Sequence, residues 1–129
     1  MIETALQPSN YEASRYLGDI VEEVDKAFGF IGGMDFNEFL ETPMVIYAVE
    51  KAMQNAVEAC IQLNNNKSNK GQFTRIFPDF DFYRLKLIAD SGRHDYGNTD
   101  PSLTWNELHG DLKNLRDAAE VILGSKRTK

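Results

Sequence analysis

The stretch P-M-V-I-Y-A-V-E-K-A-M-Q-N-A-V-E-A-C-I-Q-L, residues 43–63, decides the fold. Its apolar residues recur every three or four positions, the period of one face of an α-helix. Thr42 and Pro43 mark its start, because proline fits a first helical turn, where its missing N–H would be unpaired anyway. The repeated alanines predict close approach of a neighbouring helix or subunit. The predicted core face comprises Val45, Val49, Ala52, Met53, Ala56, Val57, Cys60 and Leu63.

A second amphipathic helix is predicted upstream, capped near Ser9 or Asn10 and ended by Gly32 and Gly33. Asp35 then offers a cap for a short helix. The apolar face of the long helix comprises Tyr16, Leu17, Ile20, Val21, Val24, Phe28 and Ile31, and that of the short helix Phe36, Phe39 and Leu40. The first ten or so residues, before the long helix, contain no apolar repeat, which predicts a loose N-terminal arm.

Two further helices are predicted downstream of a polar loop over residues 64–72. One opens at Pro78 and Asp79 and runs toward His94; the other opens at Asp100 and Pro101. The second of them is expected to end at Gly124, followed by a frayed tail. No strand-like alternation competes, so the predicted class is all-α, an antiparallel four-helix bundle with an additional short helix. We expect one domain over residues 1–129, with its core at about 16–123.

Composition excludes several classes of function. The 14 Lys and Arg against 20 Asp and Glu give a net charge of -6, so RNA or DNA binding would require a local basic patch. The single cysteine, Cys60, is predicted to be a buried, inert thiol. Phosphate-binding glycine loops, zinc-type Cys and His spacing and Gly-flanked nucleophilic serines are absent from the sequence. The lack of a long apolar run favours a cytoplasmic protein.

Side chains that can act in catalysis are concentrated in residues 90–98, D-S-G-R-H-D-Y-G-N. Asp90 and His94 are four apart, so a helix would place them on one side, where the carboxylate could fix the imidazole tautomer for general acid–base work. The alternative is a helix C-terminus, where Arg93 and His94 favour the negative end of the dipole and Gly97 ends the helix. A metal site of Glu58, Asp90 and His94 lacks the paired Glu-x-x-His pattern of helical bundles, so no metal is expected.

Five blocks of sequence resemble the HepT-like branch of the HEPN superfamily, small helical ribonuclease toxins. In order they are M-D-F-N-E-F-L-E at 34–41, A-V-E-K-A-M-Q-N-A-V-E-A at 48–59, F-P-D-F-D-F at 77–82, H-D-Y at 94–96 and L-T-W at 103–105. The resemblance covers about residues 16–123. His94 and Tyr96 align with the His and Tyr of the family's motif, and Trp105 aligns with the Trp of its last helix. Val57, Glu58 and Ala59 match the family's Gly-Glu-Ala segment in two of three positions.

The resemblance implies a homodimer whose two His-bearing helices face each other across a cleft. It also implies metal-independent RNA cleavage without a cofactor, in which His94 acts as acid or base and an arginine stabilises charge on the phosphoryl oxygens. Arg93, the neighbour of His94, is an imperfect substitute for that arginine, because it projects about 100° away around an ideal helix. Members of the family are commonly encoded with a nucleotidyltransferase antitoxin that adds AMP to the motif's tyrosine, here Tyr96. The bulk and negative charge of AMP beside His94 would block an incoming phosphate.

The chain departs from the family motif at its arginine position, which is held by Ala89. Alanine cannot offset phosphate charge, and losing one such donor typically slows a reaction about a hundred- to a thousandfold. Asp90, at the next position, would repel phosphate, and Arg84 lies about 15 Å from His94 along a helix. Three interpretations therefore remain open. The chain is an active endoribonuclease, or it is a degenerate HEPN dimer that serves as binding or regulatory partner of a nucleotidyltransferase, or it is a structural dimerisation module with no ligand.

Overall fold

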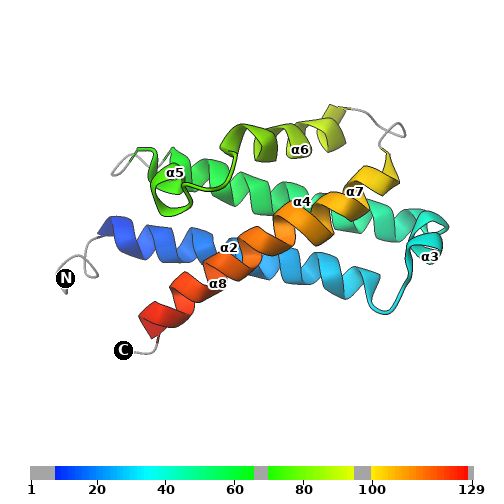
Figure 1. The fold of residues 1–129 in the computed structure, drawn as a ribbon, viewed down its shortest axis with the longest axis horizontal. Coiled ribbons are helices and arrows are strands. Elements are labelled where there is room, and N and C mark those ends of the chain that lie inside the picture. Colours follow the sequence, from blue (N-terminus) through cyan, green and yellow to red (C-terminus); the bar gives the residue numbers. More distant parts are fainter. Residues whose placement is uncertain (1–7, 66–69, 95–99, 128–129) are drawn as a thin grey trace.

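Two long helices, α2 (Pro8–Ile31) and α4 (Pro43–Asn64), pack along each other and carry most of the core (Figure 1). The computed structural model describes residues 8–65, 70–94 and 100–127, and the side chains of 13–65, 70–88 and 100–124. The predicted α4 face is confirmed, with Val45 partly buried at its edge. Side chains buried between and around the two helices include Leu17, Ile20, Val24, Val49, Ala56, Val57, Cys60 and Leu63.

The turn between α2 and α4 follows the predicted signals. Gly32 ends α2 in the left-handed region, at φ +56°, a conformation that glycine adopts without strain. Asp35 caps α3 (Phe36–Leu40) in a capping box, because its carboxylate accepts from the Glu38 N–H while the Glu38 carboxylate accepts from the Asp35 N–H. Thr42 precedes Pro43 at the start of α4, as expected.

The polar loop after α4 gives way to a short helix that the sequence prediction missed, α5 (Gln72–Ile76). Gly71 precedes it at φ +76°, and its N–H donates to the Asn64 carbonyl. The Phe73 ring contacts those of Phe77 and Phe82, and the Phe77 ring contacts that of Phe80, with centroids 5.1–5.7 Å apart. These aromatic contacts join α5 to the next helix. Residues 66–69 of the predicted loop lie outside the described part.

Helix α6 (Phe82–His94) begins later than predicted. Asp81, and not Pro78 or Asp79, supplies the cap, because its carboxylate accepts from the Arg84 N–H and its carbonyl from the Leu85 N–H. Residues 78–79 form a turn instead. The helix then runs without interruption through Gly92 to His94.

The last part of the chain is one continuous rod of three segments, α7 (Pro101–Glu107), η1 (Leu108–Leu112) and α8 (Lys113–Arg127). Asp100 caps its start as predicted, accepting from Ser102 N–H at 3.0 Å. Gly124 does not end the helix, which continues to Arg127 because glycine lowers helix stability without enforcing a stop. Helix α2 begins at Pro8, before the predicted cap at Ser9 or Asn10, so the predicted N-terminal arm is shorter than expected and its residues 1–7 lie outside the described part. Of the predicted K-R-T-K tail, residues 126–127 belong to α8 and residues 128–129 lie outside the described part.

The widened, π-helical segment η1 was also missed by the sequence prediction. In a regular α-helix the N–H of residue 109 would donate to the Trp105 carbonyl. Here the His109 ring takes that carbonyl through Nδ1 at 2.8 Å, so Nδ1 carries the proton. The exposed ring also stacks on Trp105 and meets Phe28 edge-on, with centroids 4.4 and 5.2 Å away. His109 is therefore a hydrogen-bonded surface histidine.

The all-α class is confirmed, because the described residues form helices and turns and contain no strand. Successive principal helices, α2, α4, α6 and the α7–α8 rod, run in opposite directions, with α8 crossing α2 obliquely (Figure 1). Within the described ranges, none of the helices combines the length and hydrophobicity needed to cross a bilayer.

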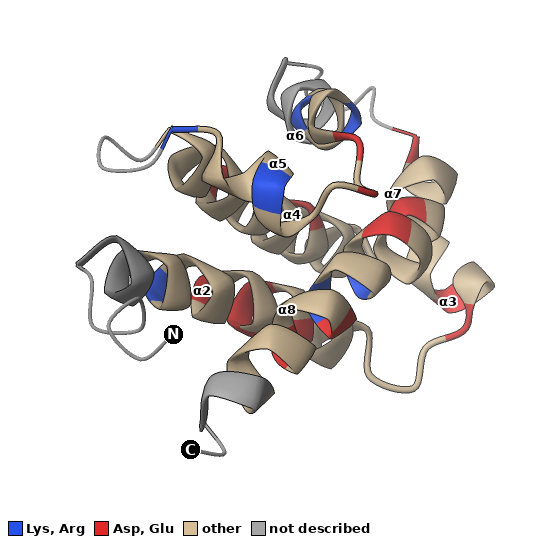
Figure 2. Cartoon of the chain, turned by 60° about the vertical axis from the view of Figure 1, so that its left-hand side comes forward, with Lys and Arg blue, Asp and Glu red and all other residues tan. Residues whose placement is uncertain are grey.

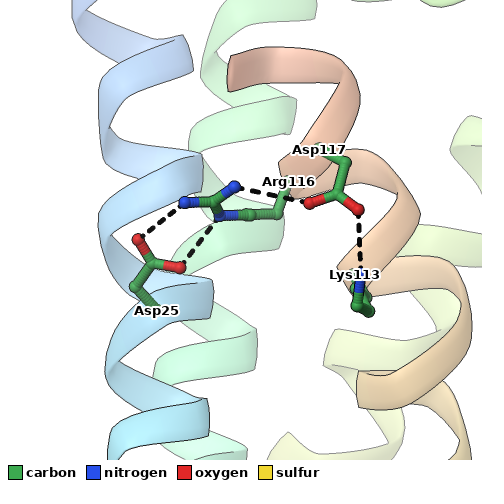
Figure 3. Close-up of polar contacts among 4 residues, drawn as sticks. All are labelled: Asp25, Lys113, Arg116 and Asp117. Atoms are coloured by element: carbon green, nitrogen blue, oxygen red, sulfur yellow. Dashed lines mark hydrogen bonds and ion pairs between the residues drawn. The ribbon is translucent and has the colours of Figure 1, made fainter. Parts of the chain in front are cut away.

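A bidentate ion pair fixes the crossing of α8 over α2. Arg116 Nε and Nη2 donate to the two Asp25 oxygens at 2.9 and 3.2 Å, and Nη1 donates to Asp117 at 3.4 Å (Figure 3). Lys113 in turn binds Asp117 at 3.0 Å. The Arg116 side chain is only 29% exposed, so this pair is less screened by water than the Lys113–Asp117 pair.

Arg116→Met should lower the free energy of unfolding by about 1 kcal/mol, because it keeps an apolar stem and removes the bidentate contact. Lys113→Met is the matched control and should lower it by about 0.3 kcal/mol, as expected of an exposed pair one helical turn apart. Urea unfolding of both variants measures the difference. Equal stability of Arg116→Met and the unmodified protein would show that the pair contributes nothing to the crossing.

A second charged cluster links α6 to the rod. Arg84 Nε donates to Asp111 Oδ2 at 2.6 Å, which joins the first turn of α6 to η1. Glu107, one turn before Asp111, is half-buried close to both charges. Burial raises the pKa of the Glu107 carboxyl above its usual value, the Arg84 charge partly offsets this, and the Asp111 charge adds to it. The ionised Glu107 carboxylate is therefore unfavourable in the folded chain.

A carboxyl with a raised pKa holds its proton more tightly when folded, so stability falls as pH rises from the ordinary carboxyl pKa through the raised value. Glu107→Gln removes this loss. The variant should unfold at a higher temperature than the unmodified protein at neutral pH. The two unfolding temperatures should converge at about pH 4, where the unmodified carboxyl is protonated. A lower unfolding temperature of Glu107→Gln at neutral pH would mean that attraction to Arg84 outweighs the cost of burial.

Candidate functional site

The predicted site lies on the second half of α6. Backbone positions 89, 90, 93 and 94, which are Ala89, Asp90, Arg93 and His94, all belong to this continuous helix, whereas Tyr96 lies outside the described residues. The spacing of one helical turn between positions 90 and 94 is therefore realised in the backbone. The side chains of residues 89–94 are outside the described part, so their roles stay predictions.

The register of α6 separates a core side from a bare side. Leu85 is 1% exposed and Phe82 and Ile88 are partly buried, whereas Tyr83 is 76% and Leu87 64% exposed. Residues three or four positions apart share one side of a helix, so the register predicts that positions 90 and 94 lie on the same side as Tyr83 and Leu87.

Position 89 falls on the other side of the helix, four residues after buried Leu85. The family's arginine would enter there, beside residues that pack on α4. Arg84 does not replace it, because this side chain lies in the first turn of α6 and binds Asp111. The expected separation of about 15 Å from position 94 holds along an uninterrupted helix.

Glu58, considered above as a metal ligand, lies elsewhere. It is exposed on α4 and accepts from the Gln62 amide at 3.3 Å. With Arg15, Asp19, Glu23 and other side chains of α2 and α4, it lines a surface groove of about 290 Å³. The described lining contains no residue of α6, so the structure does not bring Glu58 to the predicted site. No cluster of three potential metal ligands occurs among the described side chains.

Two other residues singled out from the sequence have structural roles. Trp105 packs against the rings of Phe36 and Phe39, with centroids 5.6 and 5.1 Å away, and so joins α7 to α3. Cys60 is fully buried, and burial raises the pKa of its thiol well above the ordinary range. A neutral thiol in the core is a poor nucleophile, which agrees with its predicted inertness.

Sequence reasoning missed Tyr83 and Lys86 as surface residues of interest. The Lys86 ammonium lies over the Tyr83 and Phe82 rings, 5.9 and 5.8 Å from their centroids. The sequence feature that could have identified Tyr83 is its spacing from His94. Tyr83 lies eleven residues earlier, which is close to three helical turns.

Comparison with known proteins now identifies the family. A model described as Ribonuclease HepT-like matches residues 20–122. "Putative RNase MJ1380" of Methanocaldococcus jannaschii is 25% identical over 88% of this chain and 99% of that protein. "Probable ribonuclease HepT" of Thermococcus cleftensis is 24% identical over 83% of this chain and 92% of that protein. No solved structure matches significantly. The matched region contains α3 to α7 and η1 in full, the second half of α2 and most of α8, and the chain belongs to the HepT-like ribonuclease family.

Proposed function

We propose that this chain is the toxin of a toxin–antitoxin pair and acts in the cytoplasm as a metal-independent RNA endonuclease. The observation that carries the proposal is the family match over residues 20–122, combined with the inclusion of position 94 in the last turn of helix α6. The helical register predicts that His94 lies on the side of exposed Tyr83 and Leu87, where a polymer could reach it.

The proposed reaction uses the RNA's own 2′-hydroxyl. Its oxygen attacks the adjacent phosphorus, the bond from phosphorus to the 5′-oxygen breaks, and the products carry a 2′,3′-cyclic phosphate and a 5′-hydroxyl. One proton leaves the 2′-hydroxyl and one reaches the 5′-oxygen, and His94 performs one of these transfers as base or acid. Asp90 orients the imidazole, and Arg93 offsets charge on the phosphoryl oxygens.

A homodimer is part of the proposal. Exposed apolar side chains on α6, notably Leu87, would lose water against a second copy, and two α6 helices would then border one cleft. Such pairing could supply Arg93 from one subunit to His94 of the other. This arrangement would compensate for Ala89 in the family's arginine position.

A nucleotidyltransferase antitoxin is the proposed regulator, with Tyr96 as the acceptor of AMP. The transferred nucleotide adds a phosphodiester charge two residues after His94. Repulsion of the RNA phosphate and occupation of the site would then stop cleavage together.

Ala89 favours a second candidate function, a catalytically degenerate HEPN dimer that binds and regulates the nucleotidyltransferase. This candidate shares the fold, the dimer and the partner with the first. It differs in having no nuclease activity when Tyr96 is unmodified.

RNA cleavage by the unmodified protein, His94→Ala and Ala89→Arg, side by side, tests the two candidates. The active-enzyme proposal predicts cleavage by the unmodified protein and at least about a hundredfold slower cleavage by His94→Ala, because general acid–base catalysis contributes roughly that much. Ala89→Arg should match or exceed the unmodified rate.

Equal cleavage by the unmodified protein and His94→Ala would reject the proposed site, since a contaminating nuclease would then explain both. Cleavage by Ala89→Arg alone would identify a decayed enzyme and favour the second candidate. Because position 89 faces the core side of α6, circular dichroism must first show that Ala89→Arg remains helical.

A further inference from the structure

The charges of this acidic chain are unevenly placed. Residues 70–88, which include α5 and the first half of α6, carry Lys70, Arg75, Arg84 and Lys86 against Asp79 and Asp81. The whole chain carries 14 basic against 20 acidic residues. Figure 2 shows Lys and Arg on α5, on α6 and on the segment that enters α5, together with acidic residues on the segment that enters α6. Because Arg84 is paired with Asp111, the basic surface of the α5–α6 region consists of Lys70, Arg75 and Lys86.

Side-chain contacts hold the elements of the basic surface together. The Phe73–Phe82 ring contact, with centroids 5.4 Å apart, holds α5 against the start of α6. Arg75 Nη1 donates to the Lys70 carbonyl at 2.7 Å, which places the exposed Arg75 beside exposed Lys70. These contacts fix the spacing of the cations along the two short helices.

An exposed aromatic ring lies within this basic surface. Tyr83 is 76% exposed, although a tyrosine of a folded domain commonly buries much of its ring. The Lys86 ammonium is held over that ring, and no described carboxylate lies within ion-pair distance of it. Proteins that bind single-stranded nucleic acid use such a pair of side chains. The exposed ring stacks on a base, and the cation binds a phosphate.

We propose that the α5–α6 surface binds a single-stranded segment of RNA, with a base stacked on Tyr83 and adjacent phosphates beside Lys86, Arg75 and Lys70. The inference rests on the proposed function for its ligand class. Helix α6 runs from Phe82 to His94, so RNA seated on Tyr83 lies about three helical turns from the proposed reacting residues. The surface thereby adds to the proposed nuclease a substrate path outside the reacting residues.

Binding of a fluorescein-labelled 2′-O-methyl oligoribonucleotide, followed by anisotropy, tests the surface. This probe lacks the attacking hydroxyl and is not cleaved. Tyr83→Ala should raise its Kd about tenfold and Tyr83→Phe should leave it unchanged, since stacking needs the ring alone. Lys86→Gln should reduce the slope of log Kd against log salt by about 0.7, the value for one phosphate contact on a single strand, and Lys86→Arg should preserve it.

The matched control is the double variant Lys26→Gln with Phe30→Ala. These residues are an exposed cation and an exposed aromatic one turn apart on α2. In both ribbon views α4 lies between α2 and α6, so this control should bind the probe like the unmodified protein (Figures 1 and 2). Weakening by the control equal to that of Tyr83→Ala with Lys86→Gln would overturn the proposal.

Gel filtration of each variant completes the test. Weaker binding at an unchanged oligomeric size supports the RNA surface. Unchanged binding overturns it, and so does a loss of binding that accompanies dissociation, because the loss would then follow from disruption of the dimer and not from lost RNA contacts. Tight, Tyr83-dependent binding by an unmodified protein that does not cleave RNA would retain the surface and reject the nuclease.

Discussion

The close packing of α2 against α4 is the constraint on which the rest of the structure depends. Small side chains on α4, including Ala52, Ala56 and Ala59, are buried and let a neighbouring backbone approach. Every other principal helix packs on this pair, α6 on α4 and α8 mainly on α2. Thr104 adds a polar link, because its hydroxyl donates to Glu50 on α4 at 3.0 Å. Overpacking the α2–α4 contact would therefore shift both outer helices.

The placement of α6 as an outer helix is what the proposed action on RNA requires of an acidic bundle. Only one side of α6 is needed for the core, and Leu85 occupies it. The other side is free to carry Tyr83, Lys86 and, in the register of the helix, position 94. Arg84 meanwhile joins the start of α6 to η1 through Asp111. A helix held at its first turn and bare along one side is suited to presenting chemistry at its far end.

Sequence periodicity predicted the principal helices because each has one continuous apolar stripe and recognisable caps. Asp35, Thr42 and Asp100 were correctly predicted at helix starts, since side-chain caps and proline act over three or four residues. The misses depend on tertiary contacts. Helix α5 is too short for periodicity to detect. The π-helical segment η1 includes His109, whose ring donates a hydrogen bond to the Trp105 carbonyl. Of the candidate site, sequence predicted the helix that carries it, whereas which side faces solvent required the packing of α6 on α4.

The chemical ends left on cleaved RNA test the proposed chemistry most directly. Attack by the 2′-hydroxyl requires no metal and leaves a 2′,3′-cyclic phosphate with a 5′-hydroxyl. Mass spectrometry of oligoribonucleotide fragments, produced by the purified protein in excess EDTA, measures both properties at once. The account predicts cyclic phosphate ends at a rate that EDTA does not change. Fragments with 3′-hydroxyl and 5′-phosphate ends, or cleavage that appears only when a divalent metal is restored, would contradict it.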